Sequence, residues 1–392
     1  MATILVNAIS AKSGGAITYI SNLASEIERQ LPHFRFVFLV EASVHRRFSS
    51  TEARSVPEFR EFECSNLFQR FIFDQVVARR IAREEKVDLL LSISDFGMIL
   101  PPCLQLLMIR NSLYFSQCYQ TDYLPRMSAG FRLMFRFRRV LVRLSAACSD
   151  LVVVASEAMR DEVQPVVGRL AVNRFGVPLE KFRVTSKLRP EKDLTLLFVS
   201  DYSDYKNLTT LLRAVAILKS RRILGFKVVT TADPFQFADV EVSSREADKQ
   251  LARSAEVEAH VEFTGSVPYE TVDKLYREAD IFVFPSAAES FGHPLVEAMA
   301  SGLPVIASDI PICREICRDS ALYFCRDDAA DLADRIALLM ADSDLRLRLG
   351  RRGRVLAETE YDWRKHVARL LDTIQNLIEK ENLPDATARM MV

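Results

Sequence analysis

Short apolar runs rich in β-branched residues alternate with longer amphipathic stretches along almost the whole chain. In the first half this pattern predicts strands at 3–8, 35–40, 87–93, 104–109, 151–155 and 171–175, and helices at 16–30, 68–86, 131–148 and 156–167. The alternation resumes after 176–192, a segment that holds Gly176, Pro178 and Pro190. The strands predicted there are 194–199, 226–231, 260–264, 281–284, 304–308 and 321–324. The helices predicted there are 206–220, 244–254, 268–279, 294–301, 328–342, 344–359 and a last one from about 363.

Strands that alternate with helices of this length are typical of parallel sheets with helices on both faces. The two series, separated by the Pro- and Gly-containing segment, predict an α/β protein with two doubly wound, Rossmann-like domains that face a central cleft. We expect an N-terminal domain over 1–180 and a C-terminal domain over 181–371, with a C-terminal helix from about 372 that packs back on the first. Ligands of such folds bind at the carboxyl ends of the strands.

The composition is that of a globular chain, with 49% hydrophobic and 27% charged residues among 392. No run of 18 apolar residues predicts a membrane-spanning helix. The first residues lack the basic segment of a signal peptide and are expected to form a strand. Seven Cys without a CxxC motif, and only five His, argue against a disulfide framework and a structural zinc site. A reducing cytoplasm is the compartment that this composition favours.

Charge is balanced overall but uneven along the chain. Residues 1–185 carry 24 basic and 18 acidic side chains, a net of +6, and the remainder carries 28 and 34, a net of −6. A basic half is typical of proteins with an anionic partner such as a phosphate, a nucleic acid or a membrane surface. Ordinary solvated surface explains a difference of this size equally well.

The most informative stretch is 281–309, IFVFPSAAESFGHPLVEAMASGLPVIASD. A predicted strand ends at Pro285, and a helix is expected to begin near Pro294, where Phe291, Gly292 and His293 lead into it. A helix N-terminus offers free N–H groups to a phosphate. Glu289 lies in the loop, and Glu297 is expected within the first helical turn. The pair suits hydrogen bonding to sugar hydroxyls, whereas a helix-dipole role is the simpler explanation for Glu297 alone.

The nine residues Glu289-Ser-Phe-Gly-His-Pro-Leu-Val-Glu297, followed by AMASGLPVIASD, resemble the donor-site motif of retaining GT-B glycosyltransferases of family 4. The resemblance extends to FTGSVPYETVDKLYREADIFVFPS (263–286), FVSDYSDYKNLTTLLRAV (198–215), FGVPLEKF (175–182) and the pair Gly14-Gly15. It covers essentially the whole chain, most densely from about 171 to 364. The lack of GxGxxG argues against a nicotinamide enzyme.

The resemblance implies a role for each matching residue. Glu289 would contact sugar hydroxyls of the donor, and Glu297 would hold the nucleotide ribose. Lys206, expected to open a helix after a strand, would neutralise the departing diphosphate, so that Glu289 and Lys206 are the residues implied in catalysis. The donor-binding residues that the resemblance implies are Gly14, Gly15, Lys206, Asn207, Glu289, Ser290, Phe291, Gly292, His293 and Glu297.

Two positions depart from the family pattern. An Arg that members carry five residues before the lysine is here Asp201, which cannot clamp a phosphate, so either another cation or a shorter pattern applies. A His that many members place after a strand of the first domain has no counterpart in LLMIRNSLYF (106–115). Asn111 is its candidate substitute near the sugar and acceptor, and an ordinary loop role fits Asn111 equally well.

A basic, aromatic segment stands out independently of any resemblance. Between Asp122 and Asp150 there is no acidic residue, and six Arg are interleaved with Phe, Leu, Met and Val over 126–143. Such a helix is a candidate for contact with an anionic membrane, and a solvated basic face that packs partly in the core is the alternative. Nucleic acid is not expected, because no recognisable binding module accompanies the charge.

Taken together, these features predict a cytoplasmic retaining glycosyltransferase, in peripheral contact with the inner face of the membrane. It would move a sugar from a nucleotide-diphosphate donor, with GDP-mannose as the first guess, to a glycan or lipid-linked saccharide. We expect neither a cofactor nor a metal. The alternatives are a non-catalytic nucleotide-sugar-binding protein, which Asp201 keeps open, and an epimerase or phosphorylase on the same fold.

Overall fold

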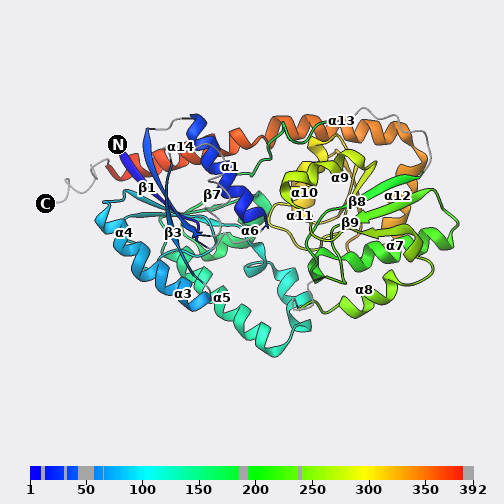
Figure 1. Cartoon of the computed structure of the whole chain (residues 1–392), viewed down its shortest axis with the longest axis horizontal. Coiled ribbons are helices and arrows are strands. Elements are labelled where there is room, and N and C mark those ends of the chain that lie inside the picture. Colours follow the sequence, from blue (N-terminus) through cyan, green and yellow to red (C-terminus); the bar gives the residue numbers. More distant parts are fainter. Residues whose placement is uncertain are drawn as a thin grey trace.

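The protein is an α/β chain, seen here in a computed structural model that describes residues 1–9, 14–30, 33–42, 57–64, 66–184, 193–236 and 241–382. Over these residues the strands form two parallel sheets, which occupy the left and right halves of Figure 1. This is the architecture that the alternating pattern predicted. The boundary expected at residue 180 falls between the last strand of one sheet and the first of the other, and as a domain boundary it stays a prediction.

The first sheet has seven strands over the described residues, in the order β3-β2-β1-β4-β5-β6-β7. Every adjacent pair is parallel. Its strands are β1 (Ala2–Asn7), β2 (Phe34–Glu41), β3 (Glu58–Phe62), β4 (Leu89–Ser92), β5 (Leu104–Ile109), β6 (Leu151–Val154) and β7 (Leu170–Val172). The four residues of β4 are all buried, as expected for a central parallel strand that is covered on both faces.

The second sheet has six strands over the described residues, in the order β10-β9-β8-β11-β12-β13, and it is also parallel throughout. Its strands are β8 (Leu194–Phe198), β9 (Phe226–Thr230), β10 (Val261–Phe263), β11 (Ile281–Phe284), β12 (Val305–Ser308) and β13 (Ala321–Phe324). Strand β11 lies between β8 and β12, so the loops that follow β8 and β11 leave the sheet side by side.

The helices of the first half are α1 (Gly14–Gln30), α3 (Leu67–Ile72), α4 (Ala78–Glu84), α5 (Ala129–Ala147) and α6 (Glu157–Val163). Those of the second half are α7 (Leu208–Ser220), α8 (Arg245–Ala252), α9 (Val272–Glu278), α10 (His293–Ala300), α11 (Pro311–Cys317), α12 (Ala329–Ala341), α13 (Ser343–Glu360) and α14 (Trp363–Asn382). Shorter helical turns are η1 (Phe73–Val77), η2 (Ser112–Tyr114), η3 (Tyr119–Tyr123), η4 (Leu124–Arg126), η5 (Gln164–Val166), η6 (Asp204–Lys206), η7 (Glu258–His260) and η8 (Tyr269–Thr271).

Three details differ from the predicted elements. Strand β3 was missed because its sequence, EFREF, is highly charged, and it lies at the edge of the sheet. Helix α11 was missed because it is only seven residues long. The helix predicted over 68–86 is interrupted by η1, a π-helical turn.

The chain passes between the halves twice, near Val177 and near Asp362, and these two segments are hydrogen-bonded to each other. The amide of Val177 donates to the carbonyl of Tyr361 over 2.9 Å, and the amide of Trp363 donates to the carbonyl of Val177 over 3.2 Å. A Cβ at Gly176 would lie 2.6 Å from the backbone of Asp362, so only glycine fits there. Helix α14 then runs back along the first half (Figure 1), where the indole N–H of Trp363 donates to the carbonyl of Asn22 in α1 over 3.1 Å.

Candidate functional site

The carboxyl ends of β8 and β11 bring together two residues that are 83 positions apart. Lys206 follows β8 and Glu289 follows β11, and these strands are adjacent in the sheet. The Nζ of Lys206 lies 2.6 Å from Oε1 of Glu289. The two side chains are only 13% and 9% exposed. Two sequence-predicted site residues therefore form one buried ion pair.

The setting of Lys206 differs in one respect from the expected one. Lys206 does not open a helix, because it ends η6 and α7 begins two residues later at Leu208. A helix dipole therefore does not act on it as supposed. Burial by itself would lower the pKa of Lys206, but the carboxylate of Glu289, with smaller contributions from Tyr205 and Asp201, raises it above its usual value. Asp201 is 4.0 Å from Nζ and 72% exposed.

The loop from β11 enters α10 through Gly292, whose φ of 79° is in the left-handed region that favours glycine. A Cβ at Gly292 would also lie 3.1 Å from Cδ1 of Leu295. Helix α10 starts at His293, directly after Gly292. In its first turn Pro294 has no N–H and the amide of Leu295 donates to the carbonyl of Gly292 over 2.9 Å, so the amides of Gly292 and His293 are the candidate donors to a ligand. This end of the helix suits an anion.

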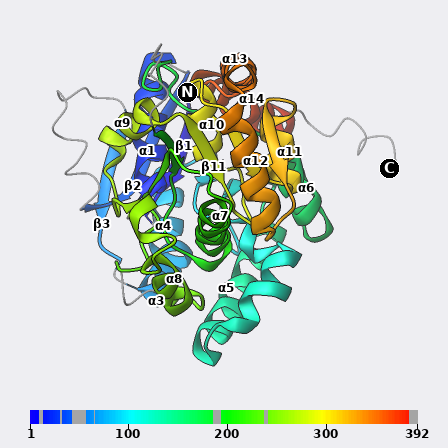
Figure 2. The same cartoon turned by 90° about the vertical axis from the view of Figure 1, so that its right-hand side faces the viewer.

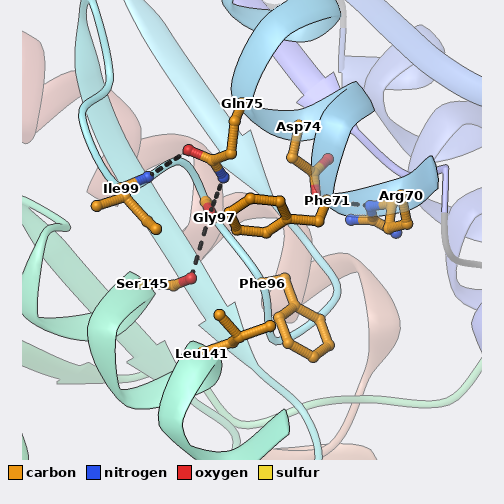
Figure 3. Close-up of a pocket in the computed structure, with 9 residues that line it drawn as sticks. All are labelled: Arg70, Phe71, Asp74, Gln75, Phe96, Gly97, Ile99, Leu141 and Ser145. Atoms are coloured by element: carbon orange, nitrogen blue, oxygen red, sulfur yellow. Dashed lines mark hydrogen bonds and ion pairs between the residues drawn. The ribbon is translucent and has the colours of Figure 1, made fainter. Parts of the chain in front are cut away.

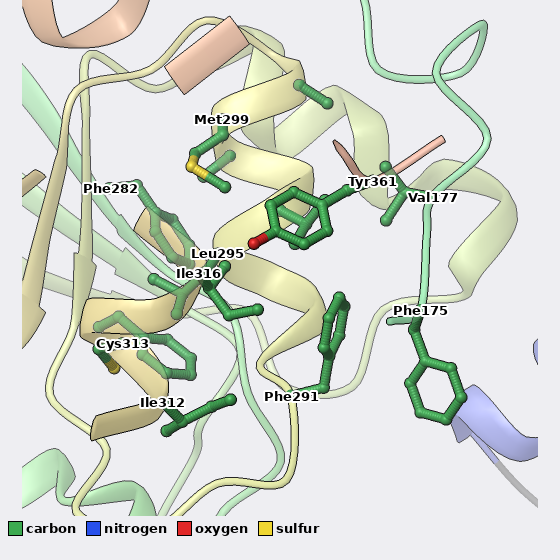
Figure 4. Packing of buried hydrophobic residues seen from close by; sticks show 14 of the residues in the cluster. Phe175, Val177, Phe282, Phe291, Leu295, Met299, Ile312, Cys313, Ile316 and Tyr361 are labelled. Carbon is green, nitrogen blue, oxygen red and sulfur yellow. The ribbon is translucent and has the colours of Figure 1, made fainter. Parts of the chain in front are cut away.

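The side chains of Phe291 and His293 belong to the packing around this helix end. Figure 4 shows Phe291 between Phe175 and Tyr361, and its ring centroid is 5.5 Å from Phe175 and 5.8 Å from Tyr361. Burial, with the nearby charges of Arg110 and Lys206, lowers the pKa of His293 to about 4, so its imidazole is neutral near pH 7. Because the ring of Phe291 packs against Phe175 and Tyr361, any contact of Phe291 with a ligand would be through its backbone.

Glu297 is buried, and its position corrects the expectation from the sequence. Because α10 begins at His293, Glu297 lies beyond the first helical turn, which contains no acidic residue. The helix-dipole explanation therefore loses its basis. The hydroxyl of Tyr276 in α9 donates to Oε2 of Glu297 over 2.7 Å. Burial raises the pKa of Glu297 to about 7, opposed by this hydrogen bond and by the charge of Lys181.

Ser290 connects the loop to the first half of the chain. Its Oγ accepts from the amide of Ser112 over 2.8 Å, and its carbonyl accepts from Oγ of Ser156 over 3.0 Å. Asn111, the residue before Ser112, caps η2 by accepting from the amide of Leu113 over 3.0 Å. Asn111 thus lies beside the loop, with its side-chain oxygen engaged in a local turn.

Asn207 is held by backbone and side-chain partners in the loops around it. Its Nδ2 donates to the carbonyl of Pro285 over 3.2 Å and to Oδ1 of Asp327 over 2.8 Å, and its Oδ1 accepts from Thr210. Gly14 and Gly15, which precede the helix predicted from residue 16, are the first two residues of α1. Residues 10–13 before them lie outside the described part of the chain.

Sequence reasoning missed the partners that act on these residues. Tyr276 binds Glu297, and Ser112 and Ser156 bind Ser290, yet all three lie outside the stretch 281–309 that carries the motif. No local pattern marks them, because strand order decides which elements meet. The site consists of a buried lysine–carboxylate pair, a helix N-terminus and a second buried carboxyl group, an arrangement able to hold a diphosphate and polar hydroxyls.

Comparison with known proteins agrees with this arrangement. Residues 181–356 match the family described as glycosyl transferases group 1. The alpha-monoglucosyldiacylglycerol synthase of Streptococcus pneumoniae is 27% identical over 340 residues, which are 81% of this chain and 73% of that protein. The phosphatidyl-myo-inositol mannosyltransferase of Mycobacterium tuberculosis is 30% identical over 236 residues, 52% of this chain and 58% of that protein.

Among solved structures, sucrose-phosphate synthase from Thermosynechococcus elongatus superposes with a TM-score of 0.76 at 17% identity, over 97% of this chain and 100% of that one. The two parallel sheets have the GT-B fold. Residues 181–356 belong to the glycosyl transferases group 1 family, and the chain is similar to retaining GT-B glycosyltransferases of family 4. It is a glycosyltransferase that uses a nucleotide-sugar donor.

Proposed function

We propose that the protein transfers a hexose from a nucleotide-diphosphate donor to a lipid acceptor, with retention of configuration. The observation that carries this proposal is the buried Lys206–Glu289 pair beside the N-terminus of α10. A buried cation beside a helix N-terminus is a preorganised site for the negative charge that develops on a departing diphosphate. The second half is then the donor-binding domain, and the first half is the acceptor side.

Each site residue has a defined part in this proposal. Lys206 and the backbone amides of Phe291, Gly292 and His293 hold the diphosphate, and Glu289 binds sugar hydroxyls. Glu297 holds the ribose. The bond between the anomeric carbon and the diphosphate breaks, and the acceptor hydroxyl attacks from the same face. The departing phosphate oxygen takes the proton of that hydroxyl, so this step needs no protein base.

The remaining candidates have supporting parts. Ser290 and Asn207 shape the loops that carry Glu289 and Lys206, since their side chains bind Ser112, Pro285 and Asp327. Asn111 lies on the acceptor side, next to Ser112. Gly14 and Gly15 open α1 after β1, at the carboxyl end of the first sheet, where an acceptor or the donor phosphate would lie.

The class of donor and acceptor follows from the relatives. One relative is named for a glucosyl lipid and the other for mannosyl transfer to a phosphatidylinositol. The donor sugar is therefore glucose or mannose in this proposal, and GDP-mannose remains the first donor to test. The acceptor is a membrane lipid or a lipid-linked saccharide.

The same acceptor class gives a role to the basic segment 126–143. It runs from Arg126, the last residue of η4, through most of α5, and the exposed Arg126, Arg136 and Arg138 would attract an anionic leaflet on the cytoplasmic side. Arg139 contributes less than the sequence suggested, because its Nε donates to the carbonyl of Tyr114 over 2.8 Å. Among the described residues, no helix is long and apolar enough to cross a bilayer.

The test is a panel of nucleotide sugars scored by protection against thermal unfolding, followed by transfer to lipid with the preferred donor. A ligand at 100 times its Kd adds about 2.7 kcal/mol to the stability. We expect a glucose or mannose donor to protect. Lys206→Ala and Glu289→Ala should each lower the rate of transfer about 10²- to 10³-fold while remaining folded. Near-normal transfer by either folded variant would remove that residue from the site, and protection by no nucleotide sugar would refute the proposal.

A further inference from the structure

The exposed large apolar side chains of this protein are concentrated in one region. Over the described residues, eighteen such side chains are exposed, and eleven of them lie in α3, η1, the loop at 100 and α5. These eleven are Phe68, Phe71, Ile72, Val76, Leu100, Phe131, Leu133, Met134, Phe137, Val140 and Leu144. Single exposed apolar residues need no explanation, but a contiguous set marks an interaction surface.

The spacing on both helices arranges these side chains in stripes. On α5, Leu133, Phe137, Val140 and Leu144 are spaced by four, three and four residues, which places them on one face of the helix. They are 45% to 71% exposed. The opposite face of α5 is buried through Phe135, Val142 and Ala146. The exposed stripe is therefore separate from the part of α5 that packs in the core.

A second stripe runs along α3 and η1. Phe68, Ile72 and Val76 follow one another at intervals of four residues, and they are 71%, 41% and 60% exposed. Helices α3 and α5 lie along the lower edge of the first half in Figure 1, and in Figure 2 α5 projects downward from the body of the molecule. The elements that carry the two stripes are neighbours, because other residues of these elements, among them Phe71 of α3 and Leu141 of α5, line one groove.

Figure 3 shows this groove, with Phe71 from α3, Phe96 from the loop after β4 and Leu141 from α5 pointing into it. Hydrogen bonds connect this loop to η1 and to α5. The side-chain amide of Gln75 accepts from the amide of Ile99 over 2.9 Å and donates to the carbonyl of Gly97 over 3.2 Å. Oγ of Ser145 donates to the same carbonyl over 3.2 Å. The contact between η1, this loop and α5 is therefore held by hydrogen bonds that do not involve the exposed apolar stripes.

The charge around the stripes has one dominant sign. Helix α5 carries Arg132, Arg136, Arg138, Arg139 and Arg143 and no acidic residue. On α3 and η1 the acidic residue is Asp74, which is buried and bound to Arg70 at 2.7 Å. An apolar surface with a basic border complements a leaflet that has an anionic headgroup layer over an apolar interior.

We infer that α3, η1, the loop at Leu100 and α5 form one membrane-insertion face, in which the α3–η1 stripe enters the headgroup–acyl boundary together with α5. This extends the proposed attraction of α5 to anionic lipid, because apolar insertion from a second element gives binding that salt does not abolish.

The inference rests on the proposed function in one respect, the delivery of the lipid acceptor. Phe96 in the groove follows Asp95, whose Oδ1 accepts from the amides of Arg110 and Asn111 over 2.6 and 2.9 Å. Ser112 then bonds to Ser290 of the donor loop. The face is thereby joined to the acceptor side through residues that contact each other.

The experiment compares the full chain with the triple variant Phe68→Ser, Ile72→Ser, Val76→Ser in co-sedimentation with two kinds of vesicle. One contains phosphatidylcholine with phosphatidylglycerol, and the other contains phosphatidylcholine alone. The matched control is Leu347→Ser with Val355→Ser on α13, two residues 53% and 59% exposed on the other half. Protection by a nucleoside diphosphate shows that each variant is folded.

We expect wild type and control to pellet with the anionic vesicles, and part of this binding to persist in 0.5 M salt. The triple variant should bind at least about tenfold more weakly, since burying several apolar side chains is worth more than 1.4 kcal/mol. Equal pelleting of the triple variant and wild type would overturn the inference, as would complete loss of wild-type binding in salt or an equal loss in the control. So would a face that only joins two copies of the chain, seen as a dimer without vesicle binding.

A transfer assay separates this inference from the proposed function. If both are right, the triple variant loses transfer to acceptor lipid in vesicles and keeps transfer to the same lipid in detergent micelles. Absence of transfer by wild type in both settings, with normal vesicle binding, would refute the proposed function and leave the face intact. Equal transfer by the variant and wild type in vesicles would refute the face and leave the proposed function intact.

Discussion

The Lys206–Glu289 pair makes the strongest prediction, because it connects stability with ligand binding. At 2.6 Å and an effective dielectric constant of about 20, the two charges attract each other by about 6 kcal/mol, part of which offsets the cost of desolvating them. Removing one member of a buried pair leaves the other unpaired and typically costs about 3–5 kcal/mol. Glu289→Ala should therefore lower the free energy of unfolding by about 3–5 kcal/mol.

Asp201 provides a matched control on the same lysine. Its carboxylate is 4.0 Å from Nζ and its side chain is 72% exposed, so solvent screens the interaction. Asp201→Ala should change the free energy of unfolding by less than about 1 kcal/mol. Urea denaturation of wild type and both variants, without ligand and at constant pH, gives the comparison directly.

Glu289→Ala should lower the stability of the protein but raise its affinity for a diphosphate. A diphosphate that binds wild type must replace Glu289 as the partner of Lys206, whereas in Glu289→Ala the cation has no such partner to give up. A nucleoside diphosphate without sugar should therefore bind Glu289→Ala more tightly than wild type and restore much of the lost stability. The intact nucleotide sugar should gain less, since Glu289 no longer binds its hydroxyls.

Titration calorimetry with the diphosphate and with the nucleotide sugar measures both affinities. Weaker diphosphate binding by Glu289→Ala than by wild type would refute the argument that Lys206 exchanges one anion for another. A loss of stability as small as that of Asp201→Ala would refute the energy assigned to the buried pair.

Three further predictions concern the rest of the site. The pKa of Glu297, raised to about 7 against an unperturbed value of about 4.5, means that this group makes the protein less stable as pH rises from about 4.5 to 7, and this contribution to the pH dependence should be absent in Glu297→Gln. If Glu297 holds the ribose as an anion, donor affinity should rise through pH 7, and Tyr276→Phe should move that rise to higher pH, measured by fluorescence titration; a pH-independent affinity would contradict this. Gly292→Ala should cost about 1–3 kcal/mol in urea denaturation, because its φ of 79° and the contact with Leu295 are both unfavourable for a Cβ, and an unchanged midpoint would show that the loop relaxes freely. Transfer should survive EDTA, because Lys206 and the α10 N-terminus supply the positive charge that the departing diphosphate needs, and loss of activity restored by Mg²⁺ or Mn²⁺ would contradict this.

Local sequence determined most of the element order. Continuous apolar runs such as 281–284 mark strands buried on both faces, and they were predicted without any knowledge of their neighbours. The loop 289–293 and the helix after it were also predicted, because Gly292 and Pro294 mark the start of a helix through their local backbone conformation. Strand β3 and helix α11 were missed, since a charged edge strand and a seven-residue helix give a weak periodic signal.

Tertiary structure decided how the candidate residues act. Strand order places β8 next to β11, and this alone turns Lys206 and Glu289 into a pair. The same packing buries Glu297 against Tyr276, which raises the pKa of a carboxyl group that the sequence could describe only as a helix residue. The exposed apolar residues of α3 indicate an interaction surface only because α5, with its own exposed apolar residues, lies near them. Periodicity reports the forces within one element, whereas pairing and burial depend on which distant elements meet.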